Sequence, residues 1–232
     1  MMDGDDDLLG LGASDGVDPL DSLDDDLLTE SEGVAVDVSQ SIFRAYDIRG
    51  IVGETLTPEV VQQIGLAIGS EAAKRGQATI CVGYDGRLSS PELAEALING
   101  LIQTGRQVIN VGQVPTPVLY FATHHLNTGS GVMITGSHNP SPYNGFKITI
   151  DNSPFFGEDI YSMGKKITEN QDMIIEDNTT FEAIDVKTLY KNYMIKEFAH
   201  LKGMKQKLII DCGNGVADTV ITDIFDALEL NY

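Results

Sequence analysis

The residues with the clearest chemical potential form the segment Thr135–Pro140, T-G-S-H-N-P, directly after the apolar run Val132–Ile134. Gly136 permits a tight backbone turn, and Asn139-Pro140 favours one. We therefore expect the Ser137 hydroxyl to lie at the carboxyl end of a strand, where open α/β sheets bind ligands. This placement makes Ser137 a candidate nucleophile.

A nucleophilic serine needs a group that accepts its proton. His138 is adjacent to Ser137, and Lys147 follows a turn expected at Tyr143–Gly145. A serine-hydrolase elbow, G-x-S-x-G, is disfavoured because Asn139 occupies the place of its second glycine. The alternative is an ordinary serine turn beside a surface histidine, and the Ser-His pair alone favours that alternative.

The segment Phe43–Gly50, F-R-A-Y-D-I-R-G, contains two of the chain's five arginines, Arg44 and Arg49. The planar guanidinium of arginine suits phosphate oxygens, so a phosphate is one candidate ligand. Pairing of either arginine with Asp47 or another carboxylate at a strand end is the equally plausible structural alternative.

Three further clusters have structural interpretations. Asp85 and Arg87 follow an apolar run and are expected to pair with each other across a turn. Gly213-Asn214-Gly215 does not open a dinucleotide fingerprint, because Asp218 stands where the third glycine should be, and the chain has no phosphate-binding lysine loop. His124-His125 has no ligand partner at metal spacing and is expected on a helix surface.

Charge narrows the classes of partner. The 232 residues include 35 Asp and Glu against 15 Lys and Arg, a formal net charge of -20, which disfavours binding to nucleic acid or to anionic membranes. No apolar run is long enough to span a bilayer, and the amino terminus has no signal-peptide pattern. Cys81 and Cys212 each fall in short apolar runs typical of buried strands rather than of disulfides. We therefore expect a reduced, cytoplasmic protein.

The acidic residues are concentrated at the start of the chain. Residues 1–40 hold 13 Asp and Glu and no Lys or Arg. Their low apolar content and like-charge repulsion predict a disordered acidic segment over residues 1–38. The spacing of its aspartates does not match a calcium-binding loop.

Beyond this segment, short apolar runs alternate with amphipathic stretches, which predicts a layered α/β domain with a mostly parallel sheet over residues 39–185. Thr57-Pro58 is expected to begin a helix that ends before Gly76. The other expected helices begin at Ser90 and Thr116 and span about 160–169 and 186–200, and the expected strands are 80–82, 108–111, 132–134, 146–150 and 207–212.

The last part of the chain, residues 186–232, has one strand and one helix after its first helix. A parallel strand needs neighbours on its sheet, so these residues are expected to be the truncated start of a second α/β domain. We accordingly interpret the sequence as a fragment of a longer protein.

Six segments in this order resemble the α-D-phosphohexomutase superfamily, and within it the bacterial phosphomannomutase/phosphoglucomutase group. They are F-R-A-Y-D-I-R-G, G-Y-D-G-R-L-S, V-P-T-P, G-V-M-I-T-G-S-H-N-P, Y-N-G-F-K and D-C-G-N-G-V-A. The resemblance runs from about residue 42 to the end, and implies the first domain and the start of the second domain of a four-domain enzyme.

The resemblance implies an isomerase that interconverts hexose 1-phosphate and hexose 6-phosphate, of mannose or glucose, through a phosphoserine and a hexose 1,6-bisphosphate. Ser137 would be the phosphoserine. Tyr46 and Arg49 would lie near the transferring phosphate and bind substrate, with Arg49 among the catalytic residues. His138 and Lys147 would transfer protons or stabilise charge.

The resemblance also implies Mg²⁺, bound through the phosphoryl group of Ser137 and through an aspartate loop beyond residue 232. Without that loop the chain alone is expected to be inactive or nearly so. Two alternatives remain: a noncatalytic phosphosugar-binding or interaction module with an acidic arm, and a phosphoglucosamine mutase. The latter is less favoured because those enzymes usually have S-A-S-H-N-P where this chain has T-G-S-H-N-P.

Overall fold

The structure is a computed structural model that describes residues 36–176 and 180–232. The predicted acidic segment lies outside the described residues except for residues 36–38, where Val38 is buried in the core. Residues 177–179 also lie outside them.

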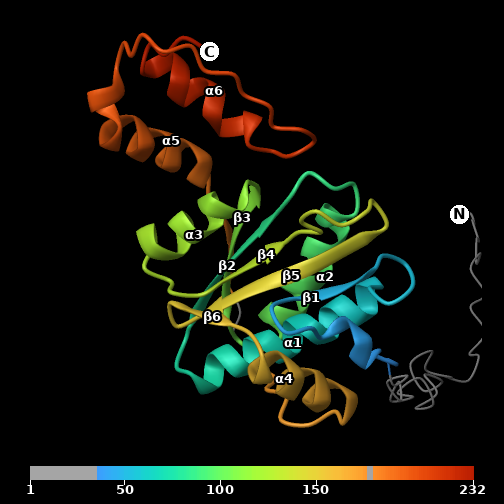
Figure 1. Ribbon diagram of the computed structural model, residues 1–232. Coiled ribbons are helices and arrows are strands. Elements are labelled where there is room, and N and C mark those ends of the chain that lie inside the picture. The colour runs from blue at the N-terminus through green and yellow to red at the C-terminus, as the bar shows by residue number, and fades with distance from the viewer. Residues whose placement is uncertain (1–35, 177–179) are drawn as a thin grey trace, which may run out of the picture. The chain divides into compact units, whose positions relative to one another are not determined.

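The described strands form one sheet in the order β1-β5-β4-β2-β3-β7, with β6 beside β5 (Figure 1). Strand β2 pairs in parallel with β3 and β4, and β3 with β7, whereas β5 pairs antiparallel with β1, β4 and β6. The predicted layered α/β class is confirmed, with the parallel strands grouped together and the antiparallel strands added beyond β4. The strands are β1 Ile48–Ile51, β2 Thr79–Tyr84, β3 Gln107–Gln113, β4 Gly131–Ile134, β5 Tyr143–Ile150, β6 Ser153–Phe155 and β7 Phe181–Ala183.

The predicted helices form close to their expected bounds. The Thr57 hydroxyl accepts a hydrogen bond from the Val60 amide at the start of α1, and Gly76 lies just past its end with a φ of 71°. None of the helices in the described ranges has the length and apolar content that a bilayer crossing requires. The helices are α1 Pro58–Lys74, α2 Ser90–Ile102, α3 Thr116–His125, α4 Glu158–Thr168, α5 Val186–Glu197 and α6 Asp218–Ala227, with 3₁₀ turns at Gln40–Ile42 and Ala199–Leu201.

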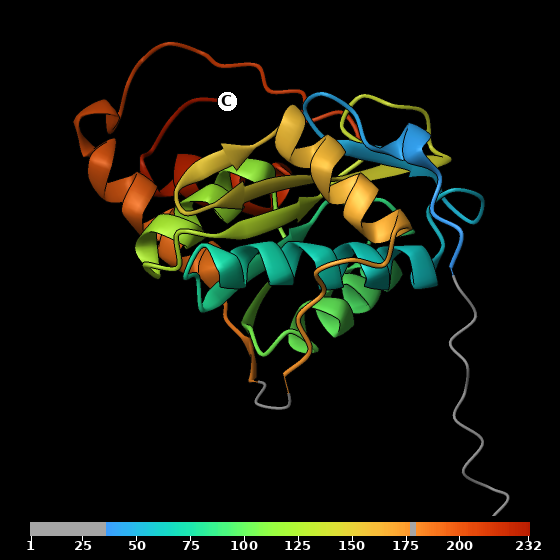
Figure 2. The same ribbon diagram turned by 90° about the horizontal axis from the view of Figure 1, so that it is seen from below.

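The helices pack on both faces of the sheet and enclose two apolar cores (Figure 2). Alternate residues of β4 point in opposite directions, as the pleat of a strand requires. Val132 and Ile134 join the core under α1, α2 and α4, whereas Met133 joins the core with α3, α5 and α6. This three-layer packing holds the strand ends in fixed positions.

The turn expected at Tyr143–Gly145 is wrong, because these residues begin β5. They pair antiparallel with β1, where Asn144 lies opposite Gly50. The Asn144 side chain donates hydrogen bonds to the hydroxyls of Ser89 and Ser90, and it accepts one from the Gly145 amide. A residue type that favours turns is therefore stabilised in a strand by tertiary hydrogen bonds.

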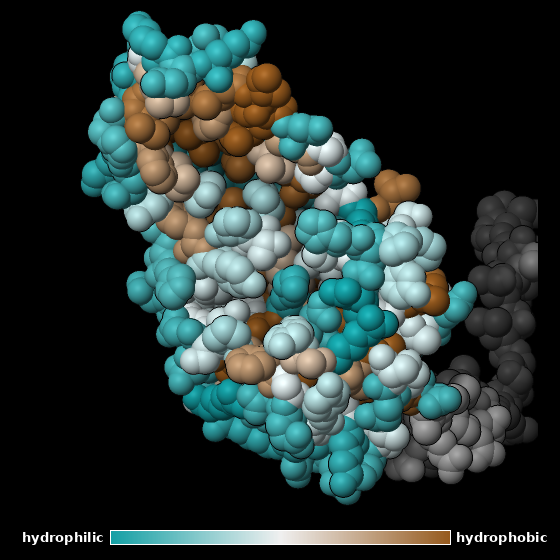
Figure 3. All heavy atoms as spheres, viewed as in Figure 1, coloured by the Kyte–Doolittle hydropathy of each residue, from teal (hydrophilic) through white to brown (hydrophobic). Residues whose placement is uncertain are grey.

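The strand expected over residues 207–212 is also wrong. Its backbone pairing is limited to one parallel bridge between Lys207 and Asn231. Residues 208–212 pair with no strand among the described residues. Ile209 is 92% exposed and Cys212 is only partly buried. Figure 3 shows apolar surface gathered over the α5–α6 end of the molecule. An apolar run adopts strand structure only where a neighbour accepts its backbone hydrogen bonds.

Close contact between α1 and α2 gives a test of the packing. A Cβ atom on Gly100 would lie 2.1 Å from the Gln62 carbonyl oxygen of α1. We expect Gly100→Ala to lower the free energy of unfolding by about 1–3 kcal/mol, because the helices would have to separate. The neighbouring exposed Asn99→Ala should be neutral or slightly stabilising in the same urea titration. A Gly100→Ala protein as stable as the wild type would contradict this packing.

Candidate active site

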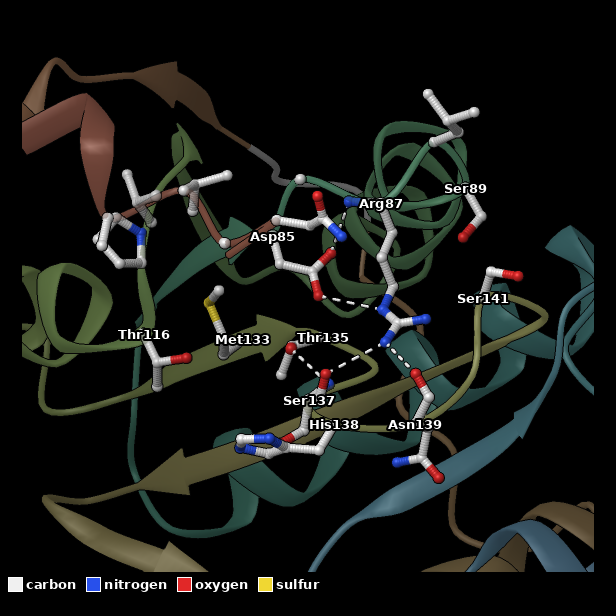
Figure 4. Close-up of a pocket in the computed structure, with 18 of the residues that line it drawn as sticks. Asp85, Arg87, Ser89, Thr116, Met133, Thr135, Ser137, His138, Asn139 and Ser141 are labelled. Carbon is white, nitrogen blue, oxygen red and sulfur yellow. Dashed lines mark hydrogen bonds and ion pairs between the residues drawn. The ribbon is translucent and has the colours of Figure 1, made fainter. Parts of the chain in front are cut away.

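The parallel strands β2, β3 and β4 end at the same edge of the sheet, and the segments that follow them line one cleft with a volume of about 930 Å³ (Figure 4). Asp85–Ser89 follows β2, Val114–Thr116 follows β3, and residues of Thr135–Asn139 follow β4. The carboxyl edge of a parallel sheet is the usual ligand site of an open α/β domain. The sequence prediction for the place of Ser137 is therefore confirmed.

Ser137 is exposed in this cleft and adopts a left-handed backbone conformation with a φ of 51°. The Ser137 amide donates a 2.9 Å hydrogen bond to the Thr135 hydroxyl. A left-handed conformation is unfavourable for a serine, and such conformations cluster at functional sites. His138 is also exposed and lines the same cleft.

Gly136 is required for a different reason from the one expected. Its φ is not in the left-handed region; that conformation falls on Ser137. A Cβ atom at Gly136 would lie 2.3 Å from the Cζ atom of Arg87. The glycine therefore permits the close approach of a guanidinium group rather than an unusual backbone turn.

Arg87 lies against the serine loop, which we define as residues 135–142. Nη1 donates hydrogen bonds to the carbonyl oxygens of Pro140 and Tyr143, both at 2.9 Å. Nη2 donates to those of Ser137 at 3.1 Å and Asn139 at 2.7 Å. Figure 4 shows this guanidinium between Asp85 and the loop.

Asp85 connects β2, α2 and the serine loop through one carboxylate. Oδ1 accepts hydrogen bonds from the Arg87 amide at 3.0 Å and the Ser90 hydroxyl at 2.7 Å. Oδ2 accepts from the Gly136 amide at 3.2 Å and lies 3.5 Å from Arg87 Nε. The predicted Asp85–Arg87 pair is confirmed. Its contacts with the serine loop were not predicted, because no sequence signal links residues about 50 positions apart.

A second group of charges lies on β1, β5 and the turn before β1. Asp47 forms an ion pair with Arg49 and lies 3.7 Å from Lys147 Nζ. The structural alternative for Arg49 is thus observed, while Arg44 is exposed. One carboxylate facing two cations leaves an excess of positive charge at this position. The Arg49 Nε atom is buried and has no hydrogen-bond partner among the described residues.

Tyr46 and Lys147 line a separate hollow of about 490 Å³, together with residues of α3, β5 and β6. Tyr46 is 78% exposed there. The structure thus brings Ser137 and His138 together in one cleft, and Tyr46 and Lys147 together in another hollow. His124 lines this second hollow, and His125 stacks on Phe121, so both lie on the surface of α3 as expected.

The segment Cys212–Ala217 was not expected at the site, yet most of its residues line the cleft of Ser137. Val216 comes close to Gly86, where an added Cβ atom would lie 2.8 Å from Val216 Cγ1. Two sequence signals mark this segment: a glycine-containing turn between an apolar run and a helix, and the D-C-G-N-G-V-A segment of the family resemblance, which was not assigned to the site. Failure of its dinucleotide motif gave no reason to connect it with Ser137.

The described residues contain no group of three or more His, Cys, Asp or Glu side chains placed to hold a metal ion. A phosphoryl group on Ser137 would add oxygen ligands but not a complete coordination sphere. The side chains in the described ranges therefore do not by themselves fit the Mg²⁺ that the sequence resemblance implies.

A serine on a left-handed turn, beside a cleft at the carboxyl edge of parallel strands, is the arrangement of a ligand-binding site in an open α/β domain. The family model described as phosphoglucomutase/phosphomannomutase, alpha/beta/alpha domain I, matches residues 40–178. The chain belongs to this family, whose members include enzymes of the isomerase class.

Relatives and solved structures agree with the family. The phosphomannomutase/phosphoglucomutase of Pseudomonas aeruginosa is 47% identical over 188 residues, which are 81% of this chain and 40% of the relative. The phosphoglucomutase of Neisseria meningitidis serogroup A is 41% identical over 82% of this chain and 41% of its own length. A crystal structure of a family protein from Burkholderia thailandensis matches with a TM-score of 0.77 and 39% identity, covering 84% of this chain and 43% of that one. The chain thus spans about two fifths of the length of these relatives.

The left-handed backbone conformation of Ser137 can be tested by measuring the stability of variants. In urea titrations we expect the free energy of unfolding of Ser137→Gly to exceed that of Ser137→Ala by up to about 1 kcal/mol. Glycine adopts the left-handed region without strain, and this gain outweighs the greater entropy that glycine loses on folding. The matched pair Ser141→Gly and Ser141→Ala should show the opposite order, since Ser141 has no positive φ. Equal stability of the two Ser137 variants would argue against the observed backbone conformation.

The two cysteines should differ in reactivity. Burial raises the pKa of the Cys81 thiol, although a hydrogen bond with Thr128 opposes this effect, so less thiolate is present at pH 8. Cys212 is partly exposed and lines the cleft. We expect iodoacetamide to modify Cys212 first and Cys81 only after urea is added, as followed by peptide mass spectrometry. Modification of both at equal rates in the folded protein would be inconsistent with this burial.

Proposed function

We propose that this chain provides the phosphoserine site of a phosphomannomutase/phosphoglucomutase, which interconverts the 1-phosphate and 6-phosphate of mannose or glucose. The observation that carries the proposal is Ser137, exposed on a left-handed turn in the cleft at the carboxyl ends of β2, β3 and β4. The 47% identity to an enzyme named for this activity supports the choice of reaction.

In the first half-reaction, the bond between phosphorus and Ser137 Oγ breaks as phosphorus bonds to O6 of a hexose 1-phosphate. The O6 proton passes to a base, and the serine oxygen takes up a proton. In the second half-reaction the Ser137 hydroxyl gives its proton to a base, and its oxygen attacks the phosphorus on O1 of the bisphosphate. The bond between phosphorus and O1 breaks and O1 takes up a proton, which restores the phosphoserine and releases hexose 6-phosphate. We assign proton transfer and charge stabilisation to His138 and Lys147, with Arg49 also catalytic.

Charge supports this assignment. A phosphoserine carries a charge of about -1.5 to -2 and must approach a second phosphate, so nearby cations are needed. Arg49 and Lys147 share Asp47, and Lys147 on β5 lies opposite Met133 of β4, the strand that leads to Ser137, so their excess positive charge is suited to this task. We assign substrate binding to Tyr46 and Arg49.

We propose Mg²⁺ as the cofactor, which supplies charge neutralisation at the phosphoryl group. In this chain its contact would be the phosphoryl group of Ser137. The remaining ligands would be aspartates from a loop beyond residue 232, as the family resemblance implies.

For the organisation of the chain, we assign residues 39–185 to domain I and residues 186–232 to the opening of a second α/β domain. The match of the domain I family model to residues 40–178 supports this boundary. Both cysteines are free in the structure, which is consistent with a location in the cytoplasm.

The proposed nucleophile is tested by Ser137→Ala in the full-length protein that includes these 232 residues. We expect conversion of glucose 1-phosphate to glucose 6-phosphate to fall by at least about 1,000-fold, because no other group takes the phosphoryl. Ser141→Ala is the matched control, since Ser141 is exposed and lines the same cleft, and it should remain active. Full activity of Ser137→Ala would exclude Ser137 as the phosphoryl carrier. Binding of hexose phosphates by a wild-type protein without conversion would favour the noncatalytic alternative.

A further inference from the structure

Every donor of the Arg87 side chain faces a protein group. A guanidinium has five N–H donors. Four are used by the hydrogen bonds from Nη1 and Nη2 to backbone carbonyls, and Nε faces the Asp85 carboxylate at 3.5 Å. The Arg87 side chain is only 18% exposed. Although Arg87 lines the cleft, neither Nη1 nor Nη2 has a donor left for a substrate phosphate.

Three of the four carbonyl groups belong to the serine loop, and the fourth belongs to the first residue of β5. They are those of Ser137, Asn139, Pro140 and Tyr143. The loop's other backbone–backbone hydrogen bonds run from the Thr135 amide to the Gly145 carbonyl, from Asn139 to Gly136, from Tyr143 to Pro140 and from Val52 to Pro142. The guanidinium therefore links the start of β5 to Ser137 through hydrogen bonds.

Asp85 holds Arg87 in place, and Gly136 leaves room for its guanidinium. Asp85 faces Nε and also accepts hydrogen bonds from the Arg87 amide and the Gly136 amide. Gly136 has no side chain and leaves room for the plane of the guanidinium, where a Cβ atom would lie within 2.3 Å of both Cζ and Nε. Lysine could not reproduce these contacts, since it has three donors on one nitrogen and no planar fork.

We propose that Arg87 is a positioning residue for phosphoryl transfer at Ser137: it binds the carbonyl groups of the serine loop and thereby holds Ser137 in its left-handed conformation. This proposal rests on the function proposed above. It assigns Arg87 to the geometry of the nucleophile and not to substrate binding, although arginine in such a cleft would ordinarily be interpreted as a phosphate ligand.

Steady-state kinetics of Arg87→Lys separate the two roles in the protein that carries this sequence. We expect kcat to fall by roughly 100-fold, as for a displaced reacting group, with KM for glucose 1-phosphate changed less than about threefold. A large rise in KM with unchanged kcat would overturn the proposal in favour of phosphate binding. A kcat within a factor of about two of the wild type would overturn it as well.

Arg106→Lys is the matched control for a merely structural loss. Arg106 also donates to backbone carbonyls, those of Gln77 and Thr104, and pairs with Glu176, but it lies just before β3, away from the cleft. The Arg106→Lys variant should lose about as much free energy of unfolding as Arg87→Lys, while its kcat should stay close to that of the wild type. Equal losses of kcat in Arg87→Lys and Arg106→Lys would show that stability alone accounts for the effect, and would overturn the proposal.

Hydrogen exchange gives a readout that does not depend on activity. In Arg87→Lys the amide hydrogens of residues 137–143 should exchange faster than in the wild type, whereas in Arg106→Lys they should not. Unchanged exchange in Arg87→Lys would overturn the proposal.

If Arg87→Lys does not fold, Gly136→Ala displaces the guanidinium while keeping Arg87, and the same loss of kcat and faster exchange are expected. A wild-type protein without mutase activity would contradict the proposed function, and hydrogen exchange would then decide separately whether Arg87 holds the loop.

Discussion

The backbone between β4 and β5 imposes the main constraint at this site. When the chain leaves β4 to form the serine loop, its carbonyl groups lose the partners that a sheet supplies, and polar backbone groups that are partly buried need replacements. One guanidinium provides partners for the carbonyl groups of Ser137, Asn139 and Pro140, and the Asp85 carboxylate holds that guanidinium against β2 and α2. The exposed hydroxyl of Ser137 thus stands on a loop connected to the rigid part of the domain.

Much of the fold was predictable because its signals are local. The Thr57-Pro58 pair marks the first turn of α1, and Gly76 marks its end, since the N-cap, the fixed φ of proline and a positive φ are properties of single residues. Apolar runs identified β2, β3 and β4. Their parallel order then placed Ser137 at the correct edge of the sheet.

Features that depend on distant residues were not predictable in this way. Tyr143–Gly145 has the composition of a turn but lies in β5, because β1 and the two serines that begin α2 supply its hydrogen bonds. The apolar run 207–212 has the composition of a strand but has no described neighbour to pair with. The role of Gly136 depends on a side chain 49 positions earlier, whose approach no spacing rule reveals.

The contacts between Arg87 and the serine loop involve the loop's main chain and none of its side chains. A change of residue type at Ser141 or Pro142 leaves every one of these carbonyl groups in place. An inserted or deleted residue would move several of them out of reach together, since each lies at a fixed distance along the chain. The loop therefore accommodates variation in composition far more readily than variation in length.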